Sequence, residues 1–141
     1  MTDSSRRFLI FTMRDNLFAF DLAHIAEVAE PPTVWPIPST PVYYQGAMNF
    51  HGVIVAVMDL PAFMGIQDCG QPEKLIVLDN RLAFLGFLVD QVIRIVPEEE
   101  ITGMDLTDDG MSSGSFFVSD RKITLLDPAR IAARATATIN N

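Results

Sequence analysis

The stretch that decides the fold is residues 37–60, which read IPSTPVYYQGAMNFHGVIVAVMDL. Two turn glycines, Gly46 and Gly52, flank Asn49, and an apolar strand is expected over residues 53–58. Glycine permits a positive φ or the close approach of another backbone, and an Asn side chain can hydrogen-bond to nearby main chain. We interpret the stretch as a loop and strand that shape a recognition surface, with a purely structural loop as the alternative for each glycine.

Three pairs of apolar runs, each joined by a short turn rich in Asp, Asn or Arg, predict β-hairpins. They are residues 8–13 with 17–22, 75–78 with 82–89, and 116–118 with 123–126, and residues 91–96 supply a further strand. Apolar and polar residues alternate only weakly, since residues 8–11 and 84–89 are almost continuously apolar. Such runs predict cover on both faces of a sheet, which two small barrels pressed together would provide.

The chain also shows a faint internal repeat of hairpin, short amphipathic stretch, proline, strand and Asp-initiated helix. Matching residues lie 66 to 68 positions apart: Leu9 and Leu75, Ile25 and Val92, Asp59 and Asp127. The repeat predicts two related halves.

Three short helices are expected. Asp59 can cap a turn that Gly65 ends, and Asp127 repeats this signature near the C-terminus. Residues 23–30 form the third candidate, with Ile25 and Val28 on one side and Glu27 on the other. Residues 98–115 are the longest polar stretch, and we expect them to form a mobile acidic connection.

Composition limits the classes of partner. The 141 residues suit one domain, and a net charge of −8 disfavours both nucleic acid and anionic lipid. No apolar run approaches the ~18 residues that span a bilayer, so we expect no membrane insertion. Cys69 is the single cysteine, which excludes an intramolecular disulfide and, with no export signal visible, favours a cytoplasmic location.

Residues that would carry chemistry are scarce. His24 and His51 with one cysteine do not suggest a zinc site, and no phosphate-binding glycine loop is present. Cys69 has no local activating base, and the acidic pairs lie in the polar stretch. We therefore expect no cofactor, no metal, no catalytic residue and no enzyme activity. Trp35 is expected in the core more readily than as an exposed anchor.

Five segments carry a resemblance to a known family: FLIF at 8–11, FAFDL at 18–22, Ile25-x-Glu27-Val28, the stretch from Pro38 to Gly46, and VIVAVMDL at 53–60. Together they resemble the CheW family, small adaptors that join chemoreceptors to the histidine kinase CheA. The likeness spans residues 8–131. It implies two interlocked five-stranded SH3-like barrels with short helices, in one domain over 8–135 with flexible ends at 1–7 and 136–141.

The resemblance also implies partners and sites. A receptor's cytoplasmic tip would bind near Ile25, Glu27 and Val28, and the CheW-like regulatory domain of a CheA-type kinase would bind end to end. The residues assigned to kinase binding or to shaping that loop are Gly46, Asn49, His51, Gly52 and Val53.

Two departures mark the chain as a divergent member. Where the family commonly reads Asn-Leu-Arg-Gly, this chain has His51, and where Asp-Leu-Arg is frequent it has Pro61. Histidine does not carry the permanent bidentate charge of arginine, so an ion pair made there is expected to weaken.

The alternative function is a small-molecule-binding regulatory β-barrel, which a thermal-shift screen would separate from an adaptor.

Overall fold

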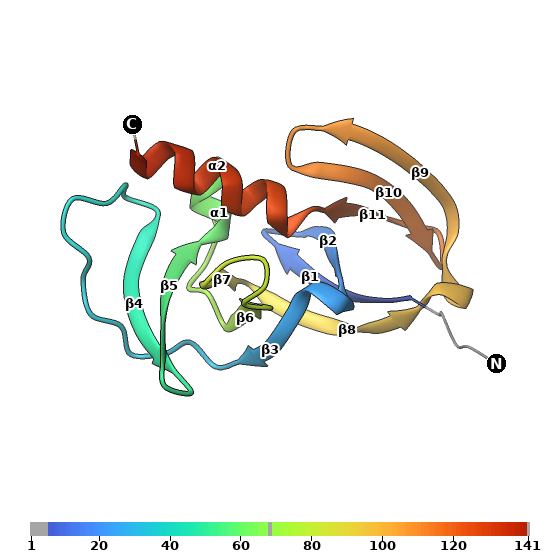
Figure 1. Cartoon of the computed structure of the whole chain (residues 1–141). Helices are drawn as coiled ribbons and strands as arrows, with labels where there is room; N and C mark the ends of the chain where they lie inside the picture. Colours follow the sequence, from blue (N-terminus) through green and yellow to red (C-terminus); the bar gives the residue numbers. More distant parts are fainter. Residues whose placement is uncertain (1–5, 68, 141) are drawn as a thin grey trace.

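The structure, a computed structural model, describes residues 6–67 and 69–140. Within these residues the chain forms a six-stranded and a five-stranded sheet, and the long helix α2 runs across both (Figure 1). Residues 1–5 and 141, which belong to the expected flexible ends, lie outside the described residues.

The elements follow one another in this order: β1 (Arg7–Met13), β2 (Asn16–Asp21), η1 (Leu22–His24), β3 (Ile25–Ala29), β4 (Tyr44–Phe50), β5 (Val53–Asp59), α1 (Leu60–Phe63), β6 (Lys74–Leu78), β7 (Leu85–Val89), β8 (Gln91–Pro97), η2 (Glu98–Glu100), β9 (Thr102–Asp109), β10 (Ser112–Val118), β11 (Arg121–Leu126) and α2 (Pro128–Asn140). The three predicted hairpins and the strands expected at 53–58 and 91–96 are confirmed.

Each sheet contains strands from both halves of the chain. The six-stranded sheet has the order β8-β1-β2-β11-β10-β9, and the five-stranded sheet has the order β3-β6-β7-β5-β4. The β1–β2 hairpin thus lies between strands of the second half, and the β6–β7 hairpin lies between strands of the first. In both sheets the second strand of the hairpin also forms a parallel pair: β2 pairs with β11, and β7 pairs with β5. The predicted repeat is confirmed, and the halves interlock by exchanging their first hairpins, β1–β2 and β6–β7.

The fold is mostly β and matches the two SH3-like subdomains that the resemblance implied. One detail differs, because the sheets contain six and five strands where five each were expected. The additional strand is β9, at the edge of the larger sheet.

Apolar runs are covered on both faces, as their sequence predicted. Leu9 and Phe11 face a seam between the sheets, whereas Phe8 and Ile10 face a separate cluster within the six-stranded sheet. The seam is built from side chains of both sheets: Leu9, Phe11, Met13, Phe18 and Phe20 on one side, and Ile76, Leu78, Leu85, Phe87 and Val89 on the other. A third cluster, which includes Val55 and Val77, fills the inside of the five-stranded sheet.

Aspartates begin the two α-helices, as expected. Asp59 Oδ1 accepts a hydrogen bond of 3.2 Å from the Ala62 N–H, and Asp127 Oδ1 accepts one of 3.0 Å from the Ala129 N–H. Gly65 follows α1 with a φ of +75°. Helix α2 continues to Asn140, beyond the five residues that the sequence signature covered, and packs Ile131 into the seam.

The helix expected over residues 23–30 is wrong. Asp21 Oδ1 accepts a 3.0 Å hydrogen bond from the Ala23 N–H, but the resulting turn, η1, ends at His24. The chain then enters β3, whose backbone pairs with β6, and these cross-strand bonds replace those of a helix. Side chains alternate along a strand, so Glu27 and Val28 point to opposite sides.

The mobile connection expected over residues 98–115 is also wrong. This segment forms η2, β9 and most of β10. The eight residues of β9 are all exposed, and the strand is held by its pairing with β10. A strand at a sheet edge with neither face buried carries no apolar alternation, which explains why the sequence pattern did not reveal it.

Removal of an aromatic ring from the seam should destabilise the whole protein. Phe20 is fully buried, and its ring centroid lies 5.7 Å from that of Phe87 in the other sheet. We expect Phe20→Ala to lower the free energy of unfolding by ~3–5 kcal/mol, because it leaves a cavity between the sheets. Urea denaturation followed by circular dichroism measures this. The control Phe84→Ala removes a ring that is 56% exposed and should cost less than ~1 kcal/mol; equal losses would contradict the role of the seam.

Candidate functional site

Tyr44–Phe50, expected as part of a loop, form strand β4, and the turn between β4 and β5 is confined to His51 and Gly52. His51 and Gly52 have φ values of +51° and +85°, the signs required in a two-residue hairpin turn of type I′. Asn49 Oδ1 accepts a 2.8 Å hydrogen bond from the Gly52 N–H and so fixes the bend. Phe50 and Val53 pair across the start of the hairpin. The turn therefore holds His51 and Val53 in defined positions.

Gly46 is required for a close approach of two backbones. A Cβ atom at this position would lie 2.3 Å from the carbonyl oxygen of Trp35. Trp35 and Ala47 exchange two backbone hydrogen bonds, of 3.0 and 2.8 Å, beside that contact. The Trp35 side chain is 48% exposed, so the expectation that it lies in the core is wrong. Gly46 shapes the loop instead of forming part of its surface.

The residues assigned to two different partners meet in space. His51 Nε2 lies 3.2 Å from Glu27 Oε1, which joins the β4–β5 turn to strand β3. Both side chains are largely exposed, and the pair is charged only when His51 is protonated. Val28 is partly exposed beside them, whereas Ile25 packs against the seam. The accessible part of the predicted receptor site is thus Glu27 and Val28.

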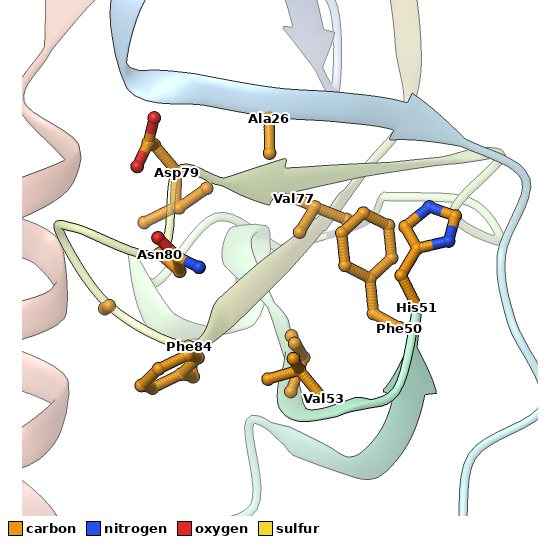
Figure 2. A pocket seen from close by; sticks show the side chains of 11 residues that line it. Ala26, Phe50, His51, Val53, Val77, Asp79, Asn80 and Phe84 are labelled. Carbon is orange, nitrogen blue, oxygen red and sulfur yellow. The ribbon is translucent and has the colours of Figure 1, made fainter.

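A cavity of about 320 Å³ opens beside the turn, at one end of the five-stranded sheet. Figure 2 shows Phe50 and His51 on one side of this opening, Asp79 and Asn80 on the other, and Val53 and Phe84 at its lower rim. The buried side chains of Val55 and Val77 also line the cavity. We call this cavity, lined also by Ala26, Leu78 and Ala83, the first end pocket.

The first end pocket has a charged group on its rim. The side chain of Arg81 donates hydrogen bonds of 3.0 and 2.8 Å to the Asp79 carboxylate, and the Arg81 backbone N–H donates a third of 2.9 Å. These bonds lower the pKa of Asp79 to about 2, so the carboxylate is ionised at neutral pH. The rim offers the Asp79–Arg81 ion pair and the pocket an apolar interior.

A second cavity of about 300 Å³ matches the first through the internal repeat. Its lining includes Ile10, Leu17, Ile93, Val118, Arg121 and Ile123. Each of these lies 67 or 68 positions from a residue of the first end pocket. The matched pairs are Ile10 with Val77, Leu17 with Phe84, Ile93 with Ala26, Val118 with Phe50, Arg121 with Val53, and Ile123 with Val55. We call it the second end pocket.

The turns beside the two pockets also correspond. Ser119 and Asp120 have φ values of +49° and +67°, like His51 and Gly52 in the first half. Sequence reasoning missed the second end pocket, although shifting residues 50–53 by the repeat offset would have located it. The polar groups of the two pockets differ, because Asp79 stands beside the first whereas Arg94 and Arg121 line the second.

Groups that could carry chemistry do not gather in the described residues. No three side chains of His, Cys, Asp and Glu come together there as metal ligands. Burial, with smaller contributions from Asp90 and Asp59, raises the pKa of the Cys69 thiol, which disfavours the reactive thiolate. Two interlocked β sheets with apolar pockets at both ends define a binding module built for contact with other proteins.

Comparison with known proteins identifies the family. The family model for the CheW-like domain matches residues 7–136. The chemotaxis protein CheW of Thermotoga maritima is 30% identical over 110 residues, which cover 76% of this chain and 72% of that protein. The chemotaxis protein CheW of Klebsiella aerogenes is 30% identical over 109 residues, 69% of this chain and 66% of that protein.

A solved structure agrees with these relatives. The crystal structure of the scaffolding protein TtCheW from Thermoanaerobacter tengcongensis superposes with a TM-score of 0.74 at 24% identity, covering 86% of this chain and 88% of that one. The chain belongs to the CheW-like family. Its function is that of a scaffold or adaptor in chemotaxis-type signal transduction, and the alternative of a small-molecule-binding barrel gains no support.

Among the described residues, none of the helices has the length and apolar character needed to cross a bilayer.

The low pKa of Asp79 is a testable property of the first end pocket. The carboxyl should titrate near pH 2 in the folded protein and move upward in Arg81→Leu, which removes the side-chain donors. Because the folded pKa lies below the ordinary value of 3.8, the stabilisation linked to this group is complete above pH ~4 and is lost as the pH falls toward 2. Carbon-detected NMR titration of both proteins measures it. An unchanged midpoint in the variant would show that Arg81 is not the cause.

Proposed function

We propose that this chain is a non-enzymatic adaptor that couples the cytoplasmic tip of a chemoreceptor to the CheW-like regulatory domain of a CheA-type histidine kinase. The members of its family are non-catalytic adaptors. The family resemblance implies that the regulatory domain of the kinase is itself CheW-like. The cytoplasmic location inferred from the single cysteine belongs to the same proposal.

The observation that carries the kinase part is the pair of matched end pockets. A partner with the same fold presents ends of the same kind, so one apolar end can cover another. The first end pocket exposes Val53 and Phe84, which are 38% and 56% accessible. Exposed apolar side chains at a concave site favour burial by a protein partner. We assign the kinase contact to this end.

The residues predicted for kinase binding then divide into two roles. Gly46, Asn49 and Gly52 shape the β4–β5 hairpin through the close approach, the side-chain hydrogen bond and the positive φ described above. His51 and Val53 line the pocket and are available to a partner. We expect substitutions in the first group to act through the shape of the turn and those in the second to act by contact.

The receptor part of the proposal concerns strand β3. Glu27 and Val28 are exposed there, while Ile25 supports the strand by packing against the seam. Because Glu27 also contacts His51, a partner on β3 and a partner at the first end pocket would both touch this pair of side chains. Holding receptor and kinase on neighbouring surfaces raises their effective concentration and lets a conformational bias of one reach the other.

The kinase contact can be tested by titration calorimetry with the regulatory domain of a CheA-type kinase from the same organism. We expect the unmodified chain to bind and Phe84→Ser to bind at least ~10-fold more weakly, a loss of ~1.4 kcal/mol for removing a central aromatic group. The control Val42→Ser changes a side chain that is 92% exposed and lies outside both end pockets, and it should leave affinity unchanged. No association of the unmodified chain would refute the kinase assignment.

The receptor contact makes a separate prediction. Glu27→Arg should weaken pull-down of the chain by a receptor's cytoplasmic helical hairpin, because it reverses the charge at the exposed part of β3. The control Glu73→Arg makes the same charge change on an exposed residue outside β3 and should have no effect. Circular dichroism should be unchanged in both variants. If the receptor hairpin captures the unmodified chain and both variants equally, Glu27 does not contact the receptor and is only a solvated residue of the strand.

A further inference from the structure

Strand β9 forms an open edge of the six-stranded sheet. It is the last strand in the sheet order, and within residues 6–67 and 69–140 its only strand partner is β10. All eight of its residues are exposed. One side of an edge strand presents backbone N–H and C=O groups without a ladder partner, which is the feature that another extended chain can pair with.

The first half of the chain blocks the equivalent edge. A Cβ atom at Gly114 would lie 2.5 Å from the Asp105 oxygen, just as one at Gly46 would lie 2.3 Å from the Trp35 oxygen, so Asp105 and Trp35 occupy equivalent places. Trp35 makes only an isolated bridge to β4. The segment around it contains Pro31, Pro32, Pro36, Pro38 and Pro41, whereas β9 contains no proline. Proline lacks an N–H and prevents strand addition, so the edge at Trp35 is closed to a further strand, whereas the edge at β9 is open to one.

The side chains of β9 are acidic and apolar. Residues 95–120 contain seven acidic residues and no basic one. Asp108 is paired with Arg130 at 2.8 Å, whereas Asp105 lies at the centre of the strand and Asp109 ends it. Met104 and Leu106, two positions apart on one side of the strand, are 37% and 69% exposed. An edge whose charges served only to prevent pairing would not need exposed apolar residues between them.

We propose that β9 is a docking edge for an extended, basic segment of a partner protein, which adds to the sheet as a further strand. Backbone hydrogen bonds to β9 would supply affinity, and basic and apolar side chains of the segment would face Asp105 and Asp109 or Met104 and Leu106. A second copy of this chain does not fit, because two β9 strands side by side would oppose like charges. The edge lies outside both end pockets, so this inference is independent of the proposed kinase contact.

The test uses a synthetic ten-residue peptide that alternates Lys or Arg with Val or Ile. Amide shifts and hydrogen exchange of the full chain are recorded by NMR with and without the peptide. We expect shifts and increased protection concentrated in residues 102–109, and affinity that falls as salt is raised. Two peptides serve as controls: one with Glu in place of every basic residue, and one with alternate backbone amides methylated to block strand pairing. Both should lose binding.

A pair of variants separates the edge from general electrostatics. Asp105→Lys with Asp109→Lys should weaken peptide binding by about tenfold or more, because two attractions become repulsions. Asp15→Lys with Glu73→Lys makes the same change in net charge elsewhere and should leave binding within about twofold. Three results would each overturn the proposal. The basic peptide could bind without protecting the amides of β9, the Glu peptide could bind equally well, or the amides of β9 could become protected when only the protein concentration is raised.

Discussion

The seam between the two sheets is the contact on which the rest of the structure depends. It collects one face of β1 and β2 and one face of β6 and β7, and it places Phe20 against Phe87. Because the β1–β2 and β6–β7 hairpins are exchanged between the halves, neither sheet is complete without strands from both. The seam and the strand exchange therefore make a single cooperative unit from two small sheets, each of which would bury little apolar surface alone.

The position of the binding surfaces follows from this construction. Each half contributes one hairpin turn with two positive φ values, and each turn stands beside an apolar pocket at the outer end of a sheet. The halves have diverged in polar residues, so the first end carries Asp79 and the second carries Arg94 and Arg121. An adaptor built this way has two similar ends with different polar groups, which lets it distinguish its neighbours while the common fold is kept.

Much of the fold could be predicted from local sequence signals. The hairpins, the caps at Asp59 and Asp127, and the cover on both faces of residues 8–11 each followed from a short pattern with a physical cause. Strand β3 was mistaken for a helix because its pairing with β6, almost fifty residues away, outweighs the helical spacing of Ile25 and Val28. Strand β9 was missed because an exposed edge needs no apolar pattern. The contact between Glu27 and His51 and the second end pocket arise from tertiary pairing, so single motifs could not reveal them.

The exchange of strands has a consequence for how the protein is made. Strand β2 ends at Asp21, and its parallel neighbour β11 begins at Arg121, 100 positions later. At ~5–20 residues per second the ribosome releases the first hairpin ~5–20 s before that neighbour emerges, which leaves its apolar strands uncovered during translation. During this interval a hairpin from one nascent chain can enter the gap left in another. Crowded polysomes thus favour intertwined products, and prompt shielding of the N-terminal hairpin would limit them.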